Sequence, residues 1–285
     1  MKIALLTCQK LPNLLESDQF LIPVLAAKNI VAVAEIWDDE NVNWSDYNYL
    51  IFRNTWDYYE KEAPFNAWLL KIQKLGIKTL NPLEVIQQNK HKFYLRDLQN
   101  LGFAIIPTLF LDKTETLNLS EIIPKSWNNA VITPAFSGGS FQTKVFDVVD
   151  IEEINQEYLQ IANQKELLLQ EFIPEIQTLG ETSFIFFNKK FSHCVNKKPV
   201  DGDFRVQSQF GGHYTLITPK IQFIHQAQEI VNSFPEKLLY ARVDGIIINN
   251  QLHLMEVECI EPDLYFDLAA GSKEFFVDEL LQLIL

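Results

Sequence analysis

The first ninety or so residues alternate strand patterns with helix patterns, and this alternation constrains the fold more than any other feature. The sequence predicts strands at 2–8, 30–37, 49–53 and 77–80, and helices at 17–28, with a Ser or Asp cap, and 62–75. Strands that alternate with helices predict a small, mostly parallel, doubly wound α/β lobe. Ligand-binding side chains are expected beyond the carboxyl ends of its strands, where Arg53-Asn54-Thr55-Trp56-Asp57-Tyr58 lies.

The pattern changes from Asn89 onward to an α+β arrangement rich in antiparallel pairing. Strands are expected at 104–111, 130–136, 141–146, 167–173, 181–187, 191–196, 240–248 and 252–260, and helices at 90–100, 151–163, 221–234 and 273–283. We therefore predict a doubly wound N-terminal lobe (1–88), a small lobe with a glycine-rich turn (89–168) and a C-terminal lobe (169–285).

Composition limits the class of protein. The chain of 285 residues is 47% hydrophobic, which is enough for a large core and for two or three lobes. No apolar run approaches the roughly 18 to 20 residues of a membrane span. The apolar start is short and has no small-residue cleavage site, so a first strand is expected rather than a signal peptide.

Cysteine usage and charge narrow the class further. Cys8, Cys194 and Cys259 are far apart and in no CxxC or Cys/His cluster, which predicts reduced thiols in a cytoplasmic protein without a structural zinc site. The net charge of −13 disfavours binding to nucleic acid, because like charges repel at long range. An anionic nucleotide with a divalent cation is still compatible with a locally positive pocket.

The segment from Arg242 to Glu258 is the strongest indication of chemistry. If a hairpin turns at Asn249-Asn250, Asp244 lies nearly opposite Glu256, and Glu258 shares the face of Glu256. Three carboxylates then converge at one end of the hairpin, beside Ile246, Ile248, Leu252 and Leu254 on the same face. Carboxylates beside an apolar surface repel one another and lose hydration, and a divalent cation relieves both costs. Oxygen ligands suit Mg²⁺ shared with phosphate. The alternative is a solvated sheet end.

Two further segments carry weaker signals for an anionic ligand. Ser137-Gly138-Gly139-Ser140 joins two β runs, and its glycines let backbone N–H groups approach a phosphate. A plain hairpin turn is the alternative. Asn89-Lys90-His91-Lys92 opens a predicted helix, where a cation opposes the helix dipole, so its placement suggests an anionic ligand; the alternative is a solvated helix end, which is common.

Taken in order, these elements resemble the ATP-grasp superfamily over nearly the whole chain. The likeness is greatest to the glutathione-synthetase-like branch, and within it to small-molecule ligases of the O-ureido-serine cyclo-ligase type. It includes Arg53 to Tyr58, Leu80-Asn81-Pro82, Asn89 to Leu95, the glycine-rich turn, Leu169 to Ile173, Gly180-Glu181, Arg205-Val206-Gln207, Phe210-Gly211-Gly212, and the three acids.

The resemblance implies roles for particular residues. It implies phosphate contacts at Lys92 and around Thr133, a mobile phosphate loop at Ser137, Gly138, Gly139 and Ser140, adenine recognition at Gln170, Glu171, Phe172 and Ile173, and ribose binding at Glu181. Lys197 and Arg205 are then catalytic, facing the γ-phosphate and the reacting centre, and Asp244, Glu256 and Glu258 bind Mg²⁺ or Mn²⁺. Arg53, Asn54, Trp56, Asp57, Gly211 and Gly212 are expected to hold the second substrate.

One position departs from the family. Thr133 stands before Pro134 where the family usually has a lysine that contacts the α- and β-phosphates. A charge-assisted hydrogen bond contributes roughly 1.5 to 3 kcal/mol, so ATP is expected to bind about ten- to a hundredfold more weakly unless Lys144 substitutes.

The implied activity is an ATP-dependent carboxylate–amine ligase or cyclo-ligase, acting on a small amino-acid-like substrate through an acyl-phosphate-type intermediate. Two alternatives are an ATP-binding protein with little or no turnover, which Thr133 favours, and a small-molecule kinase. No nucleic-acid or membrane partner is expected, and a homo-oligomer is compatible with the family.

Overall fold

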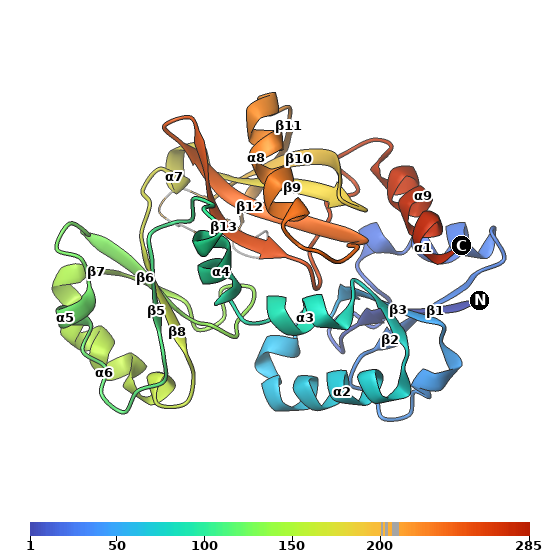
Figure 1. The fold of residues 1–285 in the computed structure, drawn as a ribbon, viewed down its shortest axis with the longest axis horizontal. Coiled ribbons are helices and arrows are strands. Elements are labelled where there is room, and N and C mark those ends of the chain that lie inside the picture. The colour runs from blue at the N-terminus through green and yellow to red at the C-terminus, as the bar shows by residue number, and fades with distance from the viewer. Residues whose placement is uncertain (201, 203–204, 207–210) are drawn as a thin grey trace.

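The N-terminal lobe is built on a parallel sheet. The structure, a computed structural model, describes residues 1–200, 202, 205–206 and 211–285 (Figure 1). Its first sheet has the order β2-β1-β3-β4, all parallel, with bounds β1 (Lys2–Thr7), β2 (Val31–Ile36), β3 (Tyr49–Asn54) and β4 (Lys78–Leu80). The two central strands are almost entirely buried, as apolar runs in a parallel sheet must be. The predicted doubly wound lobe is confirmed.

Three helices accompany this sheet: α1 (Leu21–Ala26), α2 (Glu62–Leu75) and α3 (Leu83–Asn89). α2 buries Phe65, Trp68, Leu69 and Ile72, the i, i+3, i+4, i+7 pattern of one helix face, and ends at Gly76 with φ of 68°. The helix predicted at 17–28 is shorter than expected. A 3₁₀ turn (Glu16–Asp18) precedes α1, and the Asp18 carboxylate bonds Arg53 instead of capping a helix.

The second sheet is antiparallel and has the order β5-β8-β6-β7. Its strands are β5 (Thr108–Leu111), β6 (Asn129–Pro134), β7 (Lys144–Asp147) and β8 (Leu167–Glu171), and its helices are α4 (Tyr94–Asn100), α5 (Leu119–Ile122) and α6 (Ile151–Ala162). α6 covers one face with Ile154 and Tyr158. The helix predicted at 90–100 begins later than expected, because α3 ends at Asn89 and α4 begins only at Tyr94. Lys92 lies in the junction between these helices, and its N–H donates to the Ala135 carbonyl.

The third sheet has five antiparallel strands in the order β11-β10-β9-β12-β13. Its strands are β9 (Glu181–Phe187), β10 (Lys190–Lys198), β11 (His213–Ile217), β12 (Tyr240–Ile248) and β13 (Gln251–Glu258), with helices α7 (Ile176–Leu179), α8 (Ile221–Asn232) and α9 (Ser272–Ile284). Asn249 and Asn250 have φ of 50° and 63°, which suits the two-residue hairpin turn predicted there. β11 was not predicted.

The hydrophobic core runs across the first and third lobes. α9, the last helix, packs Phe276 and Leu280 in one cluster with Ile3, Leu5 and Leu25 of the first lobe, at the end of the molecule where Figure 1 shows α1 and α9 together. The predicted lobes 1–88 and 169–285 therefore share a core, and the division into three domains stays a prediction. No helix of the described residues is long and apolar enough to cross a membrane. The three cysteines are free and buried.

Buried His193 on β10 makes stability depend on pH. Its Nε2 lies 2.9 Å from the Leu264 carbonyl oxygen, and burial lowers its pKa from 6.5 to about 4. Between these values the unfolded chain binds a proton that the folded chain does not, so stability falls as pH falls through this window. We expect this group to lower the free energy of unfolding by about 2 kcal/mol from pH 7 to pH 5. Urea unfolding should show that His193→Gln lacks this part of the fall; an unchanged pH dependence would contradict the assignment.

Candidate functional site

A cavity of about 350 Å³ lies where the three lobes meet. Its lining residues come from the strand-end segment after β3, from the second sheet with its glycine-rich turn, and from the third sheet. Of the residues singled out in the sequence, the structure brings together here Trp56, Lys92, Thr133, Ser137, Gly138, Gly139, Ser140, Gln170, Glu171, Phe172, Ile173, Glu181, Lys197, Arg205, Asp244, Glu256 and Glu258. Gly211 and Gly212 are outside the lining set, and Gln207 and Phe210 lie outside the described residues.

The pairing of the two strands of the acidic hairpin shifts by one residue between Asp244 and Gly245. Asp244 pairs with Glu256, but Gly245 pairs with Leu254, so Met255 is an extra residue in β13. This β-bulge turns Leu252 and Leu254 into the core with Val257, away from the carboxylates, and the prediction that they share the face of the acids is wrong. Met255 and Ile246 line the cavity instead. A Cβ at Gly245 would lie 2.5 Å from the His253 carbonyl oxygen, so this close pairing requires glycine.

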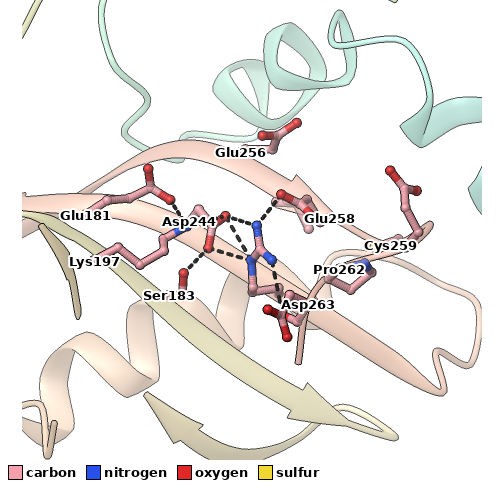
Figure 2. Close-up of polar contacts among 12 residues, drawn as sticks. Glu181, Ser183, Lys197, Asp244, Glu256, Glu258, Cys259, Pro262 and Asp263 are labelled. Carbon is pink, nitrogen blue, oxygen red and sulfur yellow. Dashed lines mark hydrogen bonds and ion pairs between the residues drawn. The ribbon is translucent and has the colours of Figure 1, made fainter. Parts of the chain in front are cut away.

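Basic side chains hold the carboxylates of this wall, which is drawn in Figure 2. Arg242 lies two residues before Asp244 on β12, donates to it at 2.8 Å, and also pairs with Glu258. Lys197 from β10 lies 3.3 Å from Asp244 and pairs with Glu181. Sequence reasoning gave Arg242 no role. The signal that could have found it is its spacing, because residues i and i+2 of a strand share a face.

Burial and mutual repulsion determine the protonation of the acids. Burial, with repulsion from Glu256 and Asp244, raises the pKa of Glu258 to about 7 although Arg242 opposes the shift. Burial also tends to raise the pKa of Asp244, but Arg242 and Lys197 outweigh it and hold that pKa below its ordinary value. At neutral pH Asp244 is therefore ionised, whereas Glu258 is protonated in part.

The donor set fits a divalent cation shared with phosphate oxygens. Seven carboxylates and four basic side chains line the cavity: Glu171, Glu181, Asp244, Glu256, Glu258, Glu261 and Asp263 against Lys92, Lys197, Arg205 and Arg242. In the part of the chain that the structure describes, no three acidic, histidine or cysteine side chains are grouped closely enough to hold a metal ion alone. Mg²⁺ commonly takes only one or two carboxylates and completes its shell with phosphate and water. The metal role of Asp244, Glu256 and Glu258 stays a prediction.

The opposite wall combines Lys92 with a group of hydroxyls. The Lys92 ammonium pairs with Glu256, so it joins the acidic wall to the junction between α3 and α4. The Thr133 hydroxyl lies 2.8 Å from that of Thr143 and 3.3 Å from that of Ser137. Lys144 does not stand in for the missing lysine, because it pairs with Glu157 and Glu153 on the face covered by α6 and is outside the lining set.

The glycine-rich turn rests on the first lobe. A Cβ on Gly138 would lie 2.5 Å from Cδ1 of Tyr59, and one on Gly139 would lie 3.2 Å from the Tyr59 hydroxyl. Tyr59 also contacts Phe141, with the two rings tilted by 43° and their centroids 5.6 Å apart. The turn connects the end of β6 at Pro134 to the start of β7 at Lys144, so it is longer than a tight hairpin turn. Its glycines permit a close approach to an aromatic ring of another lobe.

This approach gives a testable coupling. Gly138→Ala is expected to lower the free energy of unfolding by about 1 to 3 kcal/mol, because the added methyl overpacks against Tyr59. In the background of Tyr59→Ala the same change should cost at least 1 kcal/mol less. Urea unfolding of the four chains measures the coupling. Equal costs of Gly138→Ala in both backgrounds would show that the ring and the turn do not meet.

The far end of the cavity is apolar with a polar edge. Gln170, Glu171, Phe172 and Ile173 follow one another at the end of β8, with Ile106, Val131, Leu168, Ile246 and Met255 also lining the cavity. The N–H groups of Glu171 and Phe172 bond the carbonyls of Pro107 and Asn129, which fixes the strand end. Glu181 lies at the start of β9 and is nearly buried beside Lys197. An apolar slot with a carboxylate beside it suits a flat heterocycle bearing hydroxyls.

Besides the two glycines, three further predicted substrate residues lie outside the cavity lining. Arg53 is fully buried and pairs with Asp18 at 3.0 Å, and Asn54 donates to the same carboxylate at 2.9 Å. Asp57 is buried and accepts bonds from Trp37 and Lys61. None of the three lines the cavity, because each satisfies a buried partner brought from another part of the first lobe. Trp56 does line it.

Solved structures show the class of fold. The D-cycloserine synthetase DcsG structure superimposes with a TM-score of 0.87 at 21% identity, covering 99% of both chains. D-alanine–D-alanine ligase from Bacillus anthracis, solved with ATP, gives 0.67 at 13% identity, covering 99% of this chain and 96% of that one. The chain therefore has the ATP-grasp fold that its resemblance implied.

Sequence comparisons point to one group within that class. Residues 3–81 match the family model described as D-cycloserine synthetase DcsG, N-terminal domain. The cycloserine biosynthesis protein DcsG of Streptomyces lavendulae is 25% identical over 188 residues. That match spans 63% of this chain and 62% of the relative.

Proposed function

We propose that the chain is an ATP-dependent ligase that activates a carboxylate, or a similar group, of a small amino-acid-like substrate and joins it to a nitrogen. The observation that carries this proposal is one cavity lined by Lys92, the glycine-rich turn, the end of β8 and the acid–base wall of β12 and β13. An ATP-grasp fold supplies the frame, and the relatives are named for a cycloserine synthetase and a D-alanine ligase.

ATP would lie along the cavity. Its adenine would occupy the apolar slot beside Phe172 and Ile173, with the ribose hydroxyls at Glu181. The phosphates would extend past Lys92 and the hydroxyls of the turn toward Arg242. Asp244, Glu256 and Glu258 would hold Mg²⁺, which neutralises charge on the phosphates when bound. Mn²⁺ has similar ligand preferences.

The chain's own residues would then orient the transfer. A substrate carboxylate attacks the γ-phosphorus, ADP leaves, and an acyl phosphate forms. A nitrogen of the second group attacks its carbon and phosphate departs with the former carboxylate oxygen. Arg242, Lys197 and Arg205 provide fixed positive charge where negative charge develops, and such donors contribute about 10²- to 10³-fold in rate. Closure of the glycine-rich turn would exclude water from the acyl phosphate.

Steady-state release of ADP and phosphate tests the proposal. Purified chain with ATP, Mg²⁺ and one of a set of small amino acids, O-ureido-serine first, should release both only when the right substrate is present. Free phosphate rather than a phosphorylated product separates a ligase from a kinase. Release of neither with any member of the set would sink the ligase proposal.

One observation favours a second candidate, a nucleotide-binding protein without turnover. Thr133 replaces the usual phosphate lysine, and Lys144 is engaged with Glu157. Saturable binding of ATP in the absence of any ADP release would support this candidate over the ligase.

A further inference from the structure

We propose that Glu261 is the group that recognises the substrate, by binding its ammonium group, so that the chain selects amine-bearing substrates. The inference rests on the proposed function and names the chemistry of its second substrate.

Glu261 is a half-buried acid of the cavity lining, and one of its two carboxylate oxygens has no hydrogen-bond partner. It follows the predicted metal ligand Glu258 by three residues and lines the cavity. Its Oε2 atom is buried and accepts no hydrogen bond from any of the described residues. The other acids of this wall differ: Asp244, Glu256 and Glu258 each have a basic partner. A buried carboxylate without a partner is costly, and a cation supplied by a ligand removes the cost.

Side chains of the first lobe hold the backbone of the loop that carries this carboxylate. Trp56 Nε1 donates to the Glu261 carbonyl oxygen at 2.9 Å, and Arg53 Nη2 donates to the next carbonyl, that of Pro262, at 3.2 Å. Arg53 is in turn held by Asp18. The residues expected to touch substrate at this strand end thus hold the loop that carries Glu261, which makes them positioning residues.

The surroundings favour an organic cation. Trp56, Tyr58 and Tyr59 line the cavity. Burial raises the pKa of both tyrosines, and the negative charge of Glu261 raises each pKa further, so Glu261 lies near both rings. Aromatic faces together with one carboxylate form a site for an ammonium group. The ammonium of an amino acid therefore fits this corner better than a second metal.

Calorimetric binding tests the inference without turnover. Both enantiomers of O-ureido-serine, serine and alanine are titrated into the wild-type chain in the presence of a non-hydrolysable ATP analogue and Mg²⁺. The matched deamino analogues, in which hydrogen replaces the α-amino group, are titrated in the same way. At least one of these amines should bind ten- to a hundredfold more tightly than its deamino analogue. Glu261→Gln should remove that difference, while Glu261→Asp, which keeps the charge, should retain most of it.

The failure of this inference is distinguishable from failure of the ligase proposal. Amine-selective binding that depends on Glu261, without ADP release, would keep the inference and sink the ligase. Three results would overturn the inference: deamino analogues that bind as well as the amines, amine binding unchanged in Glu261→Gln, or no binding by any amine of the set. Affinity of each variant for the ATP analogue checks that the cavity is intact.

Discussion

Glu256→Gln is expected to reduce substrate-dependent release of ADP by about 10²- to 10³-fold. Glu256 lies opposite Asp244 in the hairpin and pairs with Lys92 from the other wall, so one carboxylate joins the predicted metal site to the lysine that we predict to bind phosphate. The amide keeps the shape of the side chain but removes its charge. Because the Glu256 side chain is one third exposed, the free energy of unfolding should change by no more than about 1 kcal/mol.

A control variant separates this effect from the loss of any one carboxylate from the chain. Glu274→Gln makes the same chemical change at an exposed position of α9, outside the cavity lining, and should leave ADP release at the wild-type rate. Steady-state ADP release over a range of Mg²⁺ concentrations measures both variants. Normal turnover of Glu256→Gln would show that this carboxylate does not assist phosphoryl transfer and would remove the metal assignment.

Thr133→Lys should tighten ATP binding about ten- to a hundredfold. Thr133 is on β6 and lines the cavity, and within the described part of the chain its hydroxyl bonds only those of Ser137 and Thr143. A lysine there would carry a charge toward the phosphates. The net excess of carboxylates in the lining favours an added cation as well. The gain should shrink as ionic strength rises, since it is electrostatic.

Thr133→Met is the matched control for this second change. It adds similar length at the same position without charge and should not strengthen binding. Calorimetric titration with the ATP analogue and Mg²⁺ gives all three dissociation constants. Equal values for wild type and Thr133→Lys would place residue 133 away from the phosphates and remove the explanation offered for weak binding.

Local patterns predicted the fold because its elements are strongly periodic. The buried strands β1 and β3 and the asparagine turn of the acidic hairpin follow from apolar alternation and from residues that accept positive φ. The bulge at Met255 does not follow, since it depends on how closely the backbone of β13 approaches Gly245. A single extra residue then reverses the faces of Leu252 and Leu254.

The sequence predicted the site side chains whose positions follow from the local backbone. It mispredicted those whose positions depend on a partner from another element. The glycine-rich turn and the end of β8 line the cavity as expected. Arg53 points instead to Asp18, and Lys144 to Glu157, because a buried or neighbouring opposite charge from another element outweighs a position near a strand end. Glu261 was missed because its lack of a partner becomes visible only when the lobes are assembled.

Transfer of an oxygen isotope tests the central claim most directly. When the substrate that stimulates ADP release carries ¹⁸O in its carboxylate, an acyl phosphate predicts that each released phosphate contains one ¹⁸O atom from that carboxylate. Mass spectrometry of the phosphate from a single turnover measures this. Phosphate whose new oxygen comes only from solvent water would show that ATP is hydrolysed without activating the substrate, and would contradict the account of this cavity as a ligase site.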